Sequence, residues 1–454
     1  MKISDKIYID LDKEKVDEKI LDLLTYDNPD YYQRMNLGIS VWGTPETIKT
    51  YSMRDRSLQI LRGEALKVKP YIGHHEYNFE HPDHPISLQY INKDFDLDEY
   101  QEGAVAAIKG KRQGVIHAIT SAGKSLIILK SIVEIGQKAV IVVHRKVLME
   151  QILKDIDKYI RDEKGNKIKP GIVGNGSKTF GDITVAIDKT LANNLEEVRE
   201  KFGTAFLDEC HLAPANTILS LLNSINTKYR FGVTGTLKRR DQKEFLIFST
   251  FGPVIYRIGK EELLEKGRVV PVEIKIVETD TLFDWDAACE ELGPTKARAL
   301  QEKTISLDTP RILQTLRLVS RLQAEGGKTI VLSKFVQPCY ELQEKLKEEF
   351  GIESGVITGR DSKEALESYR QMKDQDLRVI FATVGCVSTG VSISDLDNIV
   401  LISPIYTNEL LLHQIRGRLM RTAEGKTHGT LYFLYDQYIY PSWKLSRFLK
   451  IMKN

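Results

Sequence analysis

A nine-residue stretch at 118–126, AITSAGKSL, has the residue types and spacing of a phosphate-binding loop. The usual pattern is G-x-x-x-x-G-K-[ST], and Ala118 stands where the first glycine is expected. A small side chain fits there because the position precedes the tight part of the loop. Gly123 is retained where the backbone must approach a phosphate closely. The residues expected to contact a nucleotide are Thr120, Ser121, Ala122, Gly123, Lys124 and Ser125.

The chemistry of such a loop assigns a role to each of its last two residues. Lys124 reaches the β- and γ-phosphates, and Ser125 ligates Mg²⁺. About 85 residues later in the sequence, an acidic pair closes an apolar run in TAFLDECH, residues 204–211. There Asp208 is expected to hold Mg²⁺, while Glu209 orients and deprotonates the attacking water. A solvated acidic pair is the alternative, and the upstream loop disfavours it. The sequence therefore predicts ATP and Mg²⁺ as cofactors.

A second cluster of charged residues, QIRGRLMR, occupies residues 414–421. Arg418 and Arg421 are three apart, which places them on one face of a helix. From there they are expected to act as arginine fingers on the γ-phosphate. An ordinary basic helix is the alternative, but the Gln-x-x-Gly-Arg-x-x-Arg spacing argues against it. The predicted catalytic residues are Lys124, Asp208, Glu209, Gln414, Arg418 and Arg421.

Short apolar runs alternating with helix-like stretches surround these residues. The expected strands of a first set are residues 114–120, 138–144, 182–187, 204–208 and 229–236, with helices at 124–136 and 189–202. The expected strands of a second set are 272–278, 328–334, 377–383, 397–403 and 429–435, with helices at 309–326, 337–351 and 407–421. Buried parallel strands alternating with helices predict doubly wound α/β sheets. We expect two such domains, at residues 91–268 and 269–454, and 280–308 has no clear assignment.

Residues 1–90 have a different pattern and are expected to form a small α+β domain with a linker. Residues 31–75 carry seven basic and three acidic side chains together with five tyrosines and tryptophans. Residues 37–43, 47–53 and 57–63 are expected to be short strands. A histidine cluster at 74–84 could suit zinc, but no standard ligand spacing is matched.

Bulk composition sets further limits. The 454 residues carry a net charge of only +2, so overall charge does not indicate a nucleic-acid partner. No apolar run approaches the roughly 18 residues of a membrane helix, and no signal peptide is expected. Four dispersed cysteines fit a reducing cytoplasm, which would be that of a host cell if the chain is phage-encoded.

Taken together, the motifs resemble those of superfamily 2 helicases, in order, over residues 95–435. The resemblance implies two tandem RecA-like domains. The motifs that carry it are FDLDEYQ (95–101), AITSAGKS (118–125), VVHRKVLMEQ (142–151), DECH (208–211), VTGT (233–236), IVLSK (330–334), FATVGCVSTGVSI (381–393) and QIRGRLMR (414–421).

The resemblance implies roles for further residues. Gln101 would contact the adenine edge with Phe95 or Tyr100 stacking nearby, and Gly390 would also contact the nucleotide. Thr234 and Thr236 would couple the γ-phosphate site to the nucleic-acid face. The implied nucleic-acid contacts are Arg145, Thr190, Lys238, Arg239, Lys334 and Thr383.

Within superfamily 2, the chain is similar to UvsW-type bacteriophage DNA helicases, through TSAGKS, DECH and the STGVS form of the fifth motif. Those helicases remodel forks and branch-migrate recombination junctions, and they carry a small N-terminal domain implicated in duplex binding. The resemblance therefore implies an ATP-dependent helicase acting on branched or forked DNA. A monomer is expected because both halves of the nucleotide site lie in one chain.

Three alternatives stay open at this point. The first is an RNA helicase or ribonucleoprotein remodeller on the same core. The second is a nucleic-acid-binding scaffold that has lost hydrolysis, which the intact Lys124, Asp208 and Glu209 oppose. The third is the motor subunit of a restriction enzyme, which the short chain and the lack of an evident nuclease signature disfavour.

Overall fold

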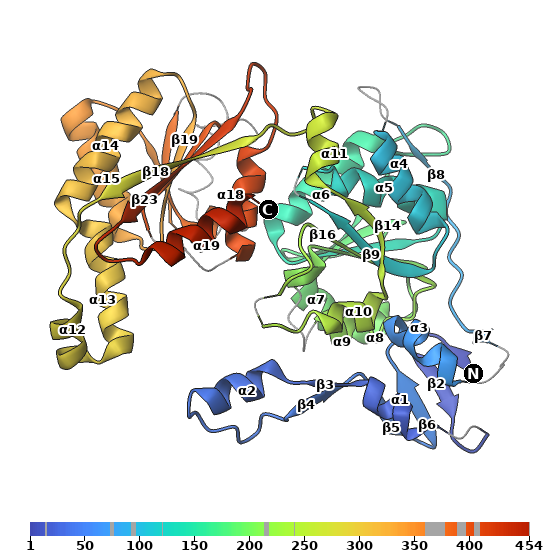
Figure 1. Ribbon diagram of the computed structural model, residues 1–454. Helices are drawn as coiled ribbons and strands as arrows, with labels where there is room; N and C mark the ends of the chain where they lie inside the picture. The colour runs from blue at the N-terminus through green and yellow to red at the C-terminus, as the bar shows by residue number, and fades with distance from the viewer. Residues whose placement is uncertain are drawn as a thin grey trace. The chain divides into compact units, whose positions relative to one another are not determined.

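The computed structural model describes residues 1–13, 16–72, 77–91, 97–119, 121–212, 218–239, 241–358, 377–387, 396–403 and 409–453. The chain divides into two compact units, Met1–Gly259 and Lys260–Asn454 (Figure 1). The second unit begins before the boundary expected at 268/269. Helix α11 (Lys260–Glu265) leads into a segment that pairs within this unit, where Val270 N donates to Met420 O at 2.8 Å. The segment 1–90 groups with the first unit.

An eight-stranded sheet, in the order β13-β12-β14-β10-β15-β16-β9-β17, forms the centre of the first unit. All five predicted strands are present and mutually parallel: β9 (Gln113–Ala118), β10 (Ala139–Val143), β14 (Ile183–Ile187), β15 (Thr204–Asp208) and β16 (Tyr229–Thr234). The others are β12 (Gly171–Gly174), β13 (Ser177–Lys178) and β17 (Val254–Ile258). Strands β10 and β15 are buried at every residue, which is why they appear as unbroken apolar runs.

Helices cover both faces of this sheet (Figure 1). Those on one face are α4 (Glu99–Lys109), α5 (Lys124–Ile135) and α6 (Lys146–Tyr159). Those on the other are α7 (Asp188–Ala192), α8 (Leu195–Val198), α9 (Ile218–Leu222) and α10 (Phe245–Phe251). The helix-like stretch at 189–202 is two short helices, because the poor helix formers Asn193 and Asn194 separate α7 from α8. A 3₁₀ turn, η3 (Cys210–Leu212), follows β15, and β8 (Leu88–Tyr90) pairs with β11 (Ile160–Asp162).

The second unit contains a six-stranded, all-parallel sheet in the order β18-β23-β22-β19-β21-β20. The strands are β18 (Val272–Thr279), β19 (Thr329–Ser333), β20 (Gly355–Ile357), β21 (Val379–Thr383), β22 (Asn398–Leu401) and β23 (Gly429–Asp436). Five of them are the predicted strands. The fold class predicted from the sequence, tandem doubly wound parallel sheets, is confirmed.

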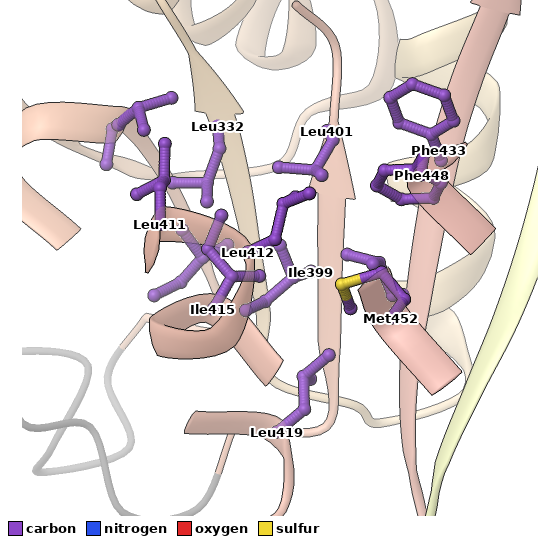
Figure 2. Close-up of a cluster of buried hydrophobic side chains, with 14 of the residues drawn as sticks. Leu332, Ile399, Leu401, Leu411, Leu412, Ile415, Leu419, Phe433, Phe448 and Met452 are labelled. Carbon is purple, nitrogen blue, oxygen red and sulfur yellow. The ribbon is translucent and has the colours of Figure 1, made fainter. Parts of the chain in front are cut away.

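Two apolar cores cover the two faces of this second sheet. Helices α14 (Thr309–Ala324) and α15 (Gln337–Phe350) pack on one face. On the other, α18 (Glu409–Leu419) and α19 (Ser442–Lys453) bury leucine, isoleucine and aromatic side chains against the strands (Figure 2). The unassigned segment 280–308 forms α12 (Trp285–Leu292) and α13 (Pro294–Leu307), and Ile305 of α13 joins the second core. A short helix, α17 (Val384–Val387), follows β21.

The N-terminal segment forms its own five-stranded sheet, in the order β5-β6-β2-β1-β7. Its elements are β1 (Lys2–Ile3), β2 (Ile7–Asp10), β5 (Tyr51–Arg54), β6 (Ser57–Ile60), β7 (Asn78–Phe79), α1 (Glu18–Leu23), α3 (Ala65–Val68), η1 (Arg62–Glu64) and η2 (Lys69–Tyr71). An arm of β3 (Thr25–Asp27), α2 (Pro29–Asn36) and β4 (Thr47–Lys49) extends from it. The strand predicted at 37–43 is wrong, because this stretch is the irregular end of the arm.

Two buried arginines join the N-terminal sheet to the large sheet of the first unit. Arg62 donates to Ser4 O at 3.2 Å, to Lys228 O at 3.1 Å and also to Thr227 O. Arg230 donates to Asp5 O at 3.3 Å, to Ile225 O at 2.9 Å and to Asn223 Oδ1 at 3.0 Å. These partners come from both sides of the joint, so the two sheets are held together by fixed backbone and amide oxygens.

Candidate nucleotide-binding and catalytic site

The phosphate-type loop lies between β9 and α5, as predicted. Gly123 is the N-cap of α5 with φ 74° and ψ 40°, and Ser121 also has a positive φ of 75°. Glycine is favoured at position 123 by these backbone angles, and a Cβ there would also displace Gln101 Nε2, which would lie 2.3 Å away. Gln101 braces the loop: its Nε2 donates to Ala122 O at 3.1 Å, and its Oε1 accepts from Asp98 N at 3.0 Å.

This loop has the features of a phosphate cradle. The Ser121 hydroxyl is buried and has no hydrogen-bond partner among the described residues. The first N–H groups of the twelve-residue helix α5 follow directly, at the end of the helix whose dipole favours negative charge. A hydroxyl without a partner, the N-terminus of a helix and a lysine lie together here, and all three can bind the phosphate groups of a nucleotide. Such a nucleotide would supply the phosphoanhydride bond to be broken.

Lys124 and Glu209 form an ion pair at the centre of the site. Burial opposes charge on both groups, yet the Lys124 ammonium holds the pKa of the Glu209 carboxyl well below its usual range. For Lys124, the Glu209 and Asp208 carboxylates outweigh the effect of burial and raise the pKa of the lysine. The lysine predicted to bind phosphate and the carboxylate predicted to act as the base are therefore paired with each other.

Asp208 closes β15, as predicted, and is buried beside this pair. Burial, together with the charge of Glu209, raises the pKa of Asp208 to about 6. The Asp208 Oδ1 atom accepts from Glu209 N at 3.0 Å. Ser125, the other predicted Mg²⁺ ligand, has its side chain hydrogen-bonded to Asp155 of α6. A carboxylate and a hydroxyl suit Mg²⁺, and Asp208 and Ser125 are the residues that would hold it.

Thr234 and Thr236, the predicted coupling residues, connect to Glu209 through His211. The His211 Nδ1 atom lies 2.7 Å from Thr234 Oγ1 and 3.3 Å from Glu209 Oε2. Thr234 Oγ1 also donates to Thr236 O at 2.6 Å, and Gly235 N donates to Glu209 Oε2 at 3.5 Å. The turn after β16 is therefore hydrogen-bonded to the Glu209 carboxylate, and a coupling role for Thr234 and Thr236 stays a prediction.

The predicted nucleic-acid contacts of the first unit differ in their surroundings. Lys238 is exposed, while Arg145 and Thr190 are half-buried at the start of α6 and within α7. Arg239 is buried: its guanidinium binds Asp241 through two bonds of 2.8 and 2.7 Å and donates to His211 O at 3.2 Å. Contact between Arg239 and a phosphate stays a prediction, and it would require the guanidinium to exchange the Asp241 carboxylate for the phosphate.

In the second unit, the two predicted contacts are also engaged. Lys334 is ion-paired with Glu302 of α13. Thr383 ends β21, is buried, and its Oγ1 lies 3.1 Å from Cys386 Sγ. Neither contact was predicted, because Glu302 lies in the segment without an assignment and Cys386, although inside the motif at 381–393, was given no role. Both residues stay predicted contacts that would have to exchange these partners.

Gln414 and Arg418 lie on α18, with Gln414 half-buried and Arg418 buried. The expectation that Arg418 and Arg421 share a helix face is wrong, because α18 ends at Leu419 and Arg421 forms an isolated β-bridge with Val269. Arg416, which the sequence did not single out, donates to Met452 O at 2.9 Å and fixes the C-terminal helix. Catalytic roles for Gln414, Arg418 and Arg421 stay predictions.

Phe95, Thr120 and Gly390 lie outside the described residues. The sequence analysis missed two acidic residues near the site, Asp155 and Asp188. Asp188 directly follows β14, and searching every strand end for an acidic residue would have found it. Asp155 lies in the middle of an amphipathic helix and gives no such signal.

The structure also bears on the histidine cluster and on the question of a membrane-spanning helix. Of the histidine cluster, His81 Nδ1 lies 2.9 Å from Asn226 Oδ1 and His84 Nε2 lies 2.7 Å from Glu200 O. The remaining members at 74–76 lie outside the described residues, and no cluster of three metal-ligating residues occurs among those that are described. No described helix is long and apolar enough to cross a membrane.

Two family models match this chain. Residues 94–239 match the type III restriction enzyme res subunit, and residues 309–423 match the helicase conserved C-terminal domain. Fold, site and these matches define a nucleotide-using helicase core of two RecA-like domains. With the motifs in order along it, this core is similar to that of the superfamily 2 helicases.

Known proteins with similar sequences include an ATP-dependent DNA helicase, uvsW, of Enterobacteria phage T4. It is 25% identical over 357 residues, which cover 76% of this chain and 69% of that protein. The DNA 3'-5' translocase XPB2 of Sulfurisphaera tokodaii is 32% identical over 181 residues, 40% of each chain. The match to the translocase thus spans less than half of either protein.

Among solved structures, the ATP-dependent type ISP restriction-modification enzyme LlaBIII bound to DNA has a TM-score of 0.56. It is 15% identical to this chain and covers 80% of it, while this chain covers 30% of that one. At this level of identity, the similarity shows only that the two proteins share a fold.

Proposed function

We propose that this helicase hydrolyses ATP to translocate on DNA and remodel branched DNA such as forks and recombination junctions. The observation that carries the proposal is the cluster of the half-buried Lys124 and Glu209 with the buried Asp208, beside the phosphate-type loop. Each member of the cluster has the chemistry its position requires, and the three meet at the carboxyl ends of β9 and β15.

Binding of a nucleotide would change the partners within this cluster. Lys124 would leave Glu209 for phosphate oxygens, and the freed Glu209 carboxylate would then accept a proton from water. The orientation of that carboxylate depends on its bonds from His211 and Gly235. The ion pair thus keeps the base from acting until a phosphate competes for the lysine.

DNA as the polynucleotide is supported by the names of the similar helicase and translocase. In this chain, the exposed Lys238 and the half-buried Arg145 and Thr190 follow strands of the same sheet as Glu209. The N-terminal arm presents Trp42, which is 93% exposed and lies within the basic segment 31–75 that is predicted to bind duplex or branched DNA. Backbone grips without base contacts predict low sequence preference and steep salt dependence.

The test is the steady-state ATPase rate with Mg²⁺ on single-stranded DNA, duplex DNA, a fork, a four-way junction and RNA. We expect branched DNA to stimulate most and RNA least. Stimulation mainly by RNA would contradict the proposal and favour an RNA remodeller. No stimulation by any polynucleotide would contradict the coupling of hydrolysis to DNA.

The matched variant for this test is Lys124→Ala. Turnover should fall to background while DNA binding is retained, because the lysine lies among nucleotide-binding rather than DNA-binding residues. Loss of DNA binding together with turnover would show that Lys124 is structural.

A further inference from the structure

A buried histidine joins the ends of three neighbouring strands. His144, Asp188 and Glu209 each directly follow a strand, namely β10, β14 and β15, and β10 lies between the other two. The His144 Nδ1 atom lies 3.0 Å from Asp188 Oδ2, and its Nε2 atom lies 3.2 Å from Glu209 O. The side chains of His144 and Asp188 are only 9% and 7% exposed. A single ring therefore connects three segments that are far apart in the sequence.

The partners fix what the ring does. A carboxylate and a backbone carbonyl both accept hydrogen bonds, so each nitrogen of the His144 ring faces an acceptor. The other Asp188 oxygen, Oδ1, accepts from Lys189 N at 2.5 Å. Asp188 thus receives one bond from the ring and one from the first turn of α7. The ring orientation is set by α7 as much as by its own strand.

Glu209 needs such support because its backbone is strained. Its φ is +51°, a left-handed conformation that costs a non-glycine residue of order 1 kcal/mol or more. Two bonds hold the residue there: Asp208 Oδ1 accepts from its N–H, and His144 donates to its carbonyl. The direction of the Glu209 carboxylate follows from this backbone conformation. His144 therefore acts on the catalytic carboxylate through the peptide and not through its side chain.

The same connection reaches the predicted polynucleotide face. Arg145 is the next residue after His144 and begins α6, while Thr190 lies in α7 two residues after Asp188. A phosphate that draws Arg145 or Thr190 would displace the ends of β10 or β14. His144 would transmit that displacement to the Glu209 carbonyl, because it is hydrogen-bonded to both segments.

We propose that His144 and Asp188 are positioning residues that couple polynucleotide contact at Arg145 and Thr190 to the orientation of the Glu209 carboxylate. The proposal rests on the proposed function, since it assumes that Glu209 is the base and that DNA binds near α6 and α7. It assigns neither residue a contact with the nucleotide or the DNA.

The experiment compares Asp188→Asn and His144→Gln with the wild-type chain, measuring kcat and KM for ATP at saturating duplex DNA, and Kd for DNA. Asp182→Asn is the matched control, because Asp182 is exposed just before the start of the same strand, β14. We expect kcat to fall about tenfold in both test variants, while KM and Kd change by less than about twofold, as for loss of an interaction that acts only in the transition state. The control should match the wild type.

A double-mutant cycle separates coupling from simple damage. If the two residues act as one unit, His144→Gln combined with Asp188→Asn should lose no more than the worse single variant. Losses that multiply, or a KM or Kd that changes as much as kcat, would overturn the proposal. So would a thermal midpoint lowered in both single variants, because that result would show a purely structural role.

Failure of this inference can be distinguished from failure of the proposed function. A wild-type chain without DNA-stimulated hydrolysis overturns the proposed function. A stimulated wild type whose kcat is unchanged in both Asp188→Asn and His144→Gln overturns only the coupling.

Discussion

Among the charged side chains that the first unit buries, those in two places differ in how the charges are satisfied. At the nucleotide site, Lys124 is paired with Glu209, beside Asp208. At the joint with the N-terminal sheet, Arg62 and Arg230 donate to backbone carbonyls and an amide oxygen. Burial lowers the pKa of both arginines, Arg230 to about 10.

This difference separates an exchangeable site from a permanent one. A carboxylate that holds a lysine can be replaced by a phosphate, because both are anions with similar hydrogen-bonding capacity. Backbone carbonyls cannot leave, so the arginines at the joint have no state to switch to. We infer that, of these two places, the lysine–carboxylate pair is the one that can exchange partners, whereas the arginines at the joint are architectural.

The largest expected effect comes from Glu209→Gln. The amide keeps the size of the side chain but cannot accept the proton from water, so kcat should fall at least about a hundredfold. The thermal midpoint should stay close to that of the wild type. ATPase assays together with thermal unfolding check this, and a large loss of stability with residual turnover would place Glu209 with the architectural charges.

Arg230→Met should give the opposite result. Removing the guanidinium leaves several buried carbonyl partners unsatisfied, and the free energy of unfolding should fall by about 3 kcal/mol. ATP turnover per folded molecule should not change. Denaturant unfolding measures the loss, with the exposed Arg321→Met as the control. Equal stability of both variants would show that the joint does not depend on Arg230.

A pH dependence of stability is expected at the joint. Burial, together with the nearby Arg62, Arg112 and Arg230, lowers the pKa of His81 from 6.5 to about 4. The unfolded chain then binds the His81 proton more readily, so His81 destabilises the fold as the pH falls from about 6.5 to about 4. In His81→Asn, the free energy of unfolding should depend less on pH in this window. An equally reduced pH dependence in the exposed His428→Asn would contradict the assignment to His81.

The smallest effect on stability is expected from Trp42→Ala in the arm. Because the side chain is 93% exposed, the thermal midpoint should change by less than about 1 °C. Affinity for forked DNA should fall by severalfold if the indole stacks on a base. A fluorescence titration with forked DNA measures this affinity. Unchanged affinity would show that the tip of the arm does not contact DNA.

Much of this protein follows from the sequence alone. The sequence predicts ten strands of the two large sheets, the loop at Gly123 and the acidic end of β15. These features were predictable because the spacing of apolar residues, the backbone freedom of glycine and the position at a strand end are local properties. The start of the arm helix α2 also has a local cause, since Asn28 caps it and Pro29 follows. The false strand at 37–43 shows the limit, because apolar residues there have no neighbouring strand with which to pair.

Only the tertiary structure decided which partner each charged residue meets. Lys124 and Glu209 are 85 positions apart, and Arg311 of α14 pairs with Asp436 at the end of β23 across 125 positions. The sequence supplied Arg239 and Arg421 as candidate ligands, but folding gave one a carboxylate partner and placed the other beyond its helix. Motifs specify residue types and local conformation, whereas burial and pairing depend on how the strands are ordered in the sheet.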